Sequence, residues 1–138
     1  MTVSAVFAIA AVLMGQATAE GTLIPGAVDF PVLGNAEVLE DCGDVSRFNL
    51  APGSQLVCLT TPNHCCHEAL LNSYGRLALD RGWRFGLADS PRVHFLRPGQ
   101  EGRCDMLTLG STRTSGSTDR FEPYDAFTIV FRPNTRCP

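Results

Sequence analysis

The chain has 138 residues, with eleven Arg, no Lys, 14 acidic residues, a formal net charge of −3 and a pI near 5.5. The length allows a single domain with a modest hydrophobic core. The mildly acidic charge balance argues against a nucleic-acid-binding protein, which would need a strongly basic surface.

The N-terminal residues have the pattern of a secretory signal. Residues 3–14 are apolar apart from Ser4, and Ala17 and Ala19 supply the small side chains that signal peptidase requires. We therefore predict a cleavable signal peptide over residues 1–19. The apolar run is shorter than the roughly 20 residues that span a bilayer, so we expect no stable membrane span after cleavage. The predicted destination is the periplasm or the exterior.

Residues 20–54 are rich in Gly and Pro, which predicts an irregular arm with short strands such as Ala36–Leu39. Its first part, up to Asp44, contains six acidic residues and no Arg. Because all eleven Arg follow, we expect the acidic arm to pack on a basic body.

Residues 55–138 are expected to form a compact α+β core. Gln55–Thr60 has the composition of a strand. A helix of some twenty residues should then run from the capping residue Thr61 and Pro62 to Gly82. An apolar stripe at intervals of three and four residues supports it, and consists of Cys66, Leu70, Tyr74, Leu77 and Ala78.

Apolar residues then alternate with period two in four further segments, which are 83–87, 92–97, 104–109 and 126–131. Short connections favour antiparallel neighbours. The predicted fold is therefore α+β, with one long amphipathic helix packed on an antiparallel sheet of four or five strands and stabilised by disulfides. We expect Trp83 and the phenylalanines in the core. Arginines around the sheet, namely Arg81, Arg84, Arg92, Arg97 and Arg103, suit a solvated face or, alternatively, a basic face for an anionic ligand.

Six cysteines in a small exported domain predict disulfides, because an oxidising compartment drives thiols to pair. The predicted disulfide residues are Cys42, Cys58, Cys65, Cys66, Cys104 and Cys137. Spacing alone leaves fifteen connectivities open. Cys104 begins one strand and Cys137 follows its hairpin partner, so the bridge Cys104–Cys137 is preferred.

The densest cluster of reactive side chains is His64-Cys65-Cys66-His67. Disulfide bonding of both cysteines is the preferred interpretation. The alternative is a metal site for copper or zinc, since His64 and His67 project from the same side of a helix and Cys and His suit these ions. On a regular helix Cys65 lies far from His67, which argues against a site that uses all four residues.

A third hypothesis is a thiol hydrolase, in which a cysteine at the helix N-terminus is activated by a histidine such as His94. No polar residue is placed to orient His94 in the sequence. We therefore predict no catalytic residue, no enzymatic activity and no cofactor. The predicted function is a binding or structural component of the periplasm or cell envelope, with a protein or envelope partner of unknown identity.

Overall fold

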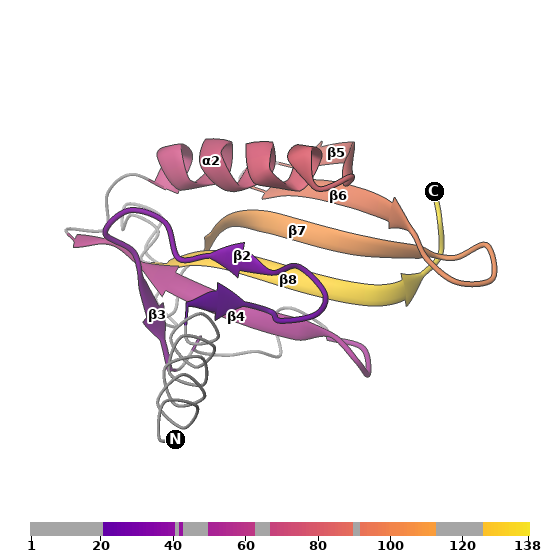
Figure 1. Ribbon diagram of the computed structural model, residues 1–138, viewed down its shortest axis with the longest axis horizontal. Helices are drawn as coiled ribbons and strands as arrows, with labels where there is room; N and C mark the ends of the chain where they lie inside the picture. Colours follow the sequence, from indigo (N-terminus) through magenta and orange to yellow (C-terminus); the bar gives the residue numbers. More distant parts are fainter. Residues whose placement is uncertain (1–20, 41, 43–49, 63–66, 90–91, 113–125) are drawn as a thin grey trace, which may run out of the picture.

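The computed structural model describes residues 21–40, 42, 50–62, 67–89, 92–112 and 126–138. These residues form one helix and eight strands (Figure 1). In chain order the elements are β1 (Thr22–Leu23), β2 (Phe30–Pro31), β3 (Glu37–Leu39), β4 (Gln55–Thr60), α2 (His67–Asp80), β5 (Arg84–Asp89), β6 (Arg92–Pro98), β7 (Cys104–Thr112) and β8 (Ala126–Thr135). Strands β1 and β2 form a small sheet, and the other six form an antiparallel sheet in the order β3-β4-β8-β7-β6-β5.

The prediction of a long helix on four or five strands is wrong. The described part of the chain is mostly sheet, and its helix has 14 residues, about 21 Å at 1.5 Å per residue. The main sheet has six strands because β3, expected within an irregular arm, pairs with β4, with Val38 opposite Leu59. The capping signals Thr61 and Pro62 lie ahead of α2, and Thr61 is buried directly after β4.

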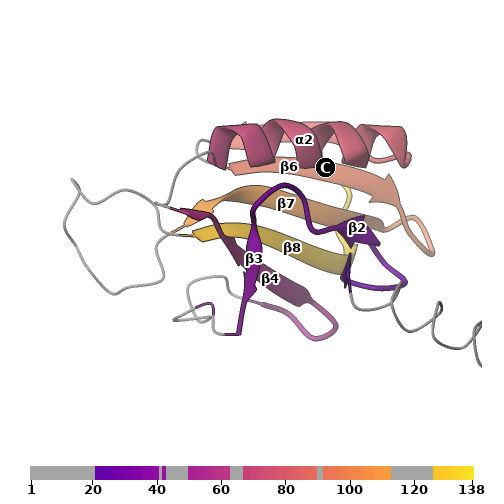
Figure 2. The same cartoon turned by 60° about the vertical axis from the view of Figure 1, so that its left-hand side comes forward.

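The six-stranded sheet has an inner face, which packs against α2 and the β1–β2 arm, and an outer face on the opposite side. Figure 2 shows α2 and β2 on the same side of the sheet. On the inner face Leu107 lies opposite Phe131, and Leu109 opposite Ile129. All four are buried in the core. The alternation along these strands therefore places the core as the sequence predicts.

Helix α2 buries three residues of the predicted stripe and ends at the predicted glycine, whereas Leu77 is half-buried and Cys66 lies outside the described residues. Leu70, Tyr74 and Ala78 are its buried residues. At its end the Trp83 N–H donates to the Ala78 carbonyl (3.0 Å), and the Gly82 N–H donates to Leu79 (3.2 Å). These two hydrogen bonds define a Schellman motif, which needs a left-handed residue, and Gly82 has φ +89°.

Three stacked rings join the arm, the helix and the sheet. The Tyr74 ring lies 5.3 Å from Phe30 of β2 and 5.8 Å from Phe127 of β8, centroid to centroid. The Tyr74 hydroxyl donates to the Pro31 carbonyl (2.8 Å) and accepts from the Leu33 N–H (3.1 Å). The arm is therefore part of the same core as the sheet.

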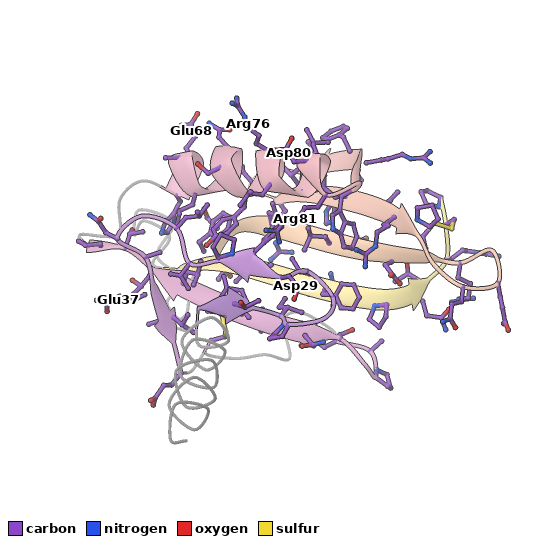
Figure 3. The ribbon with its side chains drawn as sticks, in the orientation of Figure 1. Asp29, Glu37, Glu68, Arg76, Asp80 and Arg81 are labelled. Atoms are coloured by element: carbon purple, nitrogen blue, oxygen red, sulfur yellow. A yellow bond between two sulfur atoms is a disulfide. The ribbon has the colours of Figure 1, made fainter. Side chains whose placement is uncertain are left out.

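Arginines of the body hold the arm through its backbone carbonyls. Arg81 donates to the carbonyls of Val28 (3.0 Å) and Asp29, and Figure 3 labels Arg81 between the helix and the arm. Arg97 donates to the Ala27 carbonyl (3.3 Å) and lies 4.2 Å over the Trp83 ring. The arm therefore packs on arginines of the body, as expected. The acceptors of these hydrogen bonds are backbone carbonyl oxygens of the arm and not its carboxylates.

Two disulfides lie within the described residues. Cys104 is bonded to Cys137, which is the preferred pair, and Cys42 to Cys58. The second bridge ties the segment after β3 to the strand with which β3 pairs. In the described residues, no helix is long and apolar enough to cross a membrane.

Candidate functional site

A groove on the outer face of the sheet is the candidate site, because it combines apolar lining with a histidine and an arginine. It has a volume of about 520 Å³, within the usual range of small-molecule sites. Its walls come from the four adjacent strands β5, β6, β7 and β8 and from the C-terminal segment that follows β8. The lining residues are Gly86, Leu87, His94, Leu96, Met106, Thr135, Arg136 and Pro138.

The strand irregularity at Gly86 shapes one side of the groove. β5 and β6 change register between Phe85 and Leu87. A Cβ at Gly86 would lie 3.1 Å from Leu96 Cδ1 and 3.2 Å from the His94 carbonyl oxygen. A side chain at this position would push these neighbours away by a few tenths of an ångström, so Gly86 favours the close approach of β5 to the groove floor.

The C-terminal segment forms the other side and is fixed covalently. The Cys104–Cys137 disulfide lies between two of the lining residues, Arg136 and Pro138, and ties them to the start of β7. The Thr135 hydroxyl donates to the Cys104 carbonyl (2.9 Å). The disulfide therefore holds a wall of the groove as well as crosslinking the hairpin.

The groove has an apolar floor and one polar end. Leu87, Leu96 and Met106 supply apolar surface, whereas His94 supplies an imidazole. The His94 Nδ1 lies 2.9 Å from the Thr108 Oγ1.

The same hydroxyl accepts a second hydrogen bond, because Arg132 donates to Thr108 Oγ1 (3.3 Å). The hydroxyl can in turn donate its own hydrogen to the His94 Nδ1, and a neutral imidazole bonded in this way carries its proton on Nε2. In that tautomer His94 has an N–H donor for a ligand.

Burial lowers the pKa of His94 below its ordinary value. The Asp89 carboxylate opposes this shift, whereas the positive charges of Arg132 and Arg92 add to it. Burial likewise lowers the pKa of Arg132, with a further contribution from Arg92. His94 is therefore neutral at pH 7, and the positive charges of the outer face come from arginine.

Most of the predicted histidine-cysteine cluster lies outside the described residues. This applies to His64, Cys65 and Cys66. His67 is the first residue of α2, and its ring lies 6.4 Å from Phe127. Within the described ranges, no group of three or more His, Cys, Asp or Glu side chains could hold a metal ion. The copper or zinc hypothesis stays a prediction.

His94 and His67 lie on different sides of the sheet. Phe95 faces α2, since a Cβ at Gly75 of the helix would lie 3.5 Å from the Phe95 ring. The adjacent His94 must point to the outer face. The structure therefore does not bring His94 together with the residue that begins α2.

Of the eight residues that line the groove, only His94 was a candidate functional residue from the sequence. His94 and Leu96 share the strand face opposite to Val93 and Phe95, which was a usable signal. The contribution of Arg136 had no such signal, because its position depends on the disulfide.

Comparisons of the chain with protein-family models, curated proteins and solved structures find no match.

Proposed function

We propose that this protein is an exported, non-enzymatic binding domain, and that its ligand occupies the outer-face groove. The observation that carries the proposal is the combination of an apolar floor with one imidazole and one guanidinium at the same groove. Small-molecule sites are commonly apolar with a few polar groups that fix the orientation of the ligand. His94 and Arg136 are suited to that role.

The chemistry of the groove favours an amphipathic ligand with an anionic group. Leu87, Leu96 and Met106 offer contact to an apolar body. Arg136 provides a permanent positive charge, and the His94 Nε2–H provides a hydrogen-bond donor. A carboxylate or sulfonate pairs with Arg136, and the His94 imidazole bonds a second polar group farther along the groove, whereas a cationic amphiphile is repelled by Arg136.

The proposed location is the periplasm or the exterior, with a molecule of the envelope as the natural partner. Two disulfides support this, since structural disulfides persist in oxidising compartments. The apolar N-terminal stretch with Ala17 and Ala19 supports it from the sequence.

Fluorescence titration of the exported, oxidised protein with 8-anilinonaphthalene-1-sulfonate tests the proposal. This probe combines an apolar ring system with a sulfonate. We expect saturable binding at one site per chain, displacement by decanoate, and no displacement by decyltrimethylammonium. Arg136→Glu should weaken binding about tenfold, because it reverses a charge beside the anion.

The matched control is Arg76→Glu, which makes the same charge change on helix α2, on the other side of the sheet from the groove. Figure 3 shows Arg76 pointing away from the sheet. This variant should leave the affinity unchanged. Equal losses in both variants would mean that net charge, and not the groove, governs binding. Absence of saturable binding, or equal displacement by the anionic and cationic amphiphiles, would refute the proposal.

A further inference from the structure

Strand β5 is an exposed edge of the six-stranded sheet. It is the last strand in the sheet order, and no described strand pairs with its outer side. All six of its residues are exposed. Its Phe85 and Leu87 side chains are 60% and 61% exposed, which makes them the most exposed of the large apolar side chains in the described chain.

This edge lacks most of the usual protection against pairing. Edge strands are commonly blocked by Lys, by Pro or by short length, and a bulge twists some of them away. β5 has six residues, Arg-Phe-Gly-Leu-Ala-Asp, without Lys or Pro. The opposite edge, β3, has only three residues. β5 is therefore the edge on which a further strand can add.

The bulge at Gly86 gives β5 a self-complementary charge pattern. Residues 84 and 89 are five positions apart and would point to opposite faces in a regular strand. Because the register shifts between Phe85 and Leu87, Arg84 lies opposite Leu96 and Asp89 opposite Arg92. Leu96 and Arg92 are four apart on β6, so Arg84 and Asp89 point to the same face.

We propose that two copies of this chain associate through their β5 strands, antiparallel, around a twofold axis at Leu87, with the bulged Gly86 of each strand outside the paired register. In this register Arg84 of each copy lies opposite Asp89 of the other, and Phe85 lies opposite Ala88. In each pair the two side chains point to the same face of the sheet, as directly opposite residues of antiparallel strands must. The two main sheets become one continuous sheet of twelve strands, twice the six of each copy.

The pairing explains the exposed apolar side chains and joins the two grooves. Phe85 gains an apolar neighbour from the second copy, and the backbone groups of the edge gain hydrogen-bond partners. Leu87 lines the outer-face groove, so the grooves of the two copies lie on either side of the axis. A six-residue edge gives a small interface, and we expect a dissociation constant of about 10–100 µM.

Sedimentation equilibrium of the exported protein from about 1 to 500 µM, a range chosen to bracket that dissociation constant, tests the proposal. We expect a reversible monomer–dimer equilibrium. Arg84→Asp should weaken the dimer about tenfold, because it places two carboxylates opposite each other, and Asp89→Arg should do the same with two guanidinium groups. The double variant Arg84→Asp/Asp89→Arg should restore the wild-type constant, since the pair is exchanged but still complementary.

The control is Val38→Lys, at an exposed side chain of the opposite edge, which should leave association unchanged. Urea unfolding of each variant separates loss of association from loss of folding. A protein that is monomeric over the whole range refutes the proposal. A dimer that Val38→Lys disrupts, or that the double charge exchange does not restore, also refutes it.

Discussion

The hydroxyl of Tyr74 joins the arm to the helix by two hydrogen bonds. The substitution Tyr74→Phe measures what these bonds contribute to the free energy of unfolding. Its ring is fully buried between Phe30 and Phe127, which the phenylalanine ring would replace without a change of packing. The only atom lost is the oxygen that bonds the Pro31 carbonyl and the Leu33 N–H.

The size of the effect follows from these two hydrogen bonds. A typical one contributes about 0.5–1.5 kcal/mol net, and more is lost when a buried partner remains unsatisfied. Both partners of Tyr74 are only partly buried, so water can replace some of the lost bonding. We expect Tyr74→Phe to lower the free energy of unfolding by about 1–2 kcal/mol. Burial also raises the pKa of the Tyr74 hydroxyl, so the effect should be constant across neutral pH.

Urea unfolding with the disulfides intact measures the loss in the free energy of global unfolding. Amide hydrogen exchange at Leu33 measures the loss of stability in the arm. The Leu33 amide should exchange faster by more than the global destabilisation accounts for, because the arm opens first. The exposed neighbour Ser73→Ala serves as control and should change stability by less than about 0.5 kcal/mol. A Tyr74→Phe protein with wild-type stability and unchanged Leu33 exchange would refute the reasoning.

Two further predictions concern the disulfides and His94. Replacing Cys104 and Cys137 together by Ser should cost about 4 kcal/mol in urea unfolding, against about 3 kcal/mol for Cys42 and Cys58, because the first bridge closes the longer loop, with a sequence separation of 33 against 16. A larger loss from the shorter loop would contradict the loop-entropy argument. Because the pKa of His94 is lowered in the folded state, the unfolded chain binds the proton more readily. The stability that neutral His94 contributes is complete above about pH 6.5, the pKa of this histidine in the unfolded chain. It is lost as the pH falls through the lower pKa of His94 in the folded state. Unfolding midpoints at pH 7.5 and 5.5 should therefore differ less in His94→Gln than in the wild type, and an equal pH dependence would show that His94 is not desolvated.

Local patterns predicted several elements well. The strand Gln55–Thr60 has the predicted bounds, and the end of α2 at Gly82 follows from the need for a left-handed residue. The buried residues Leu70, Tyr74 and Ala78 follow from helical spacing. The preferred pairing of Cys104 with Cys137 followed from hairpin symmetry.

Other features depended on contacts between distant segments. The number of strands was underestimated because β3 is stabilised as a strand by pairing with β4, and its three residues carry little signal of their own. The expectation that every phenylalanine is buried failed at Phe85. Alternation places Phe85 on the inner face, but β5 is the edge strand, and only the sheet order reveals that.

Local sequence was enough to predict the strands β4, β6, β7 and β8 and the C-terminal stop of the helix, because these depend on residues close together in the chain. The groove and the exposed edge became visible only in the folded chain. The groove arises where β5 to β8 and the C-terminal segment meet, through a bulge at Gly86 and a disulfide at Cys137. The edge is exposed because β5 is the last strand in the sheet order. Their positions are set by strand order and register, which depend on long-range pairing that no local pattern specifies.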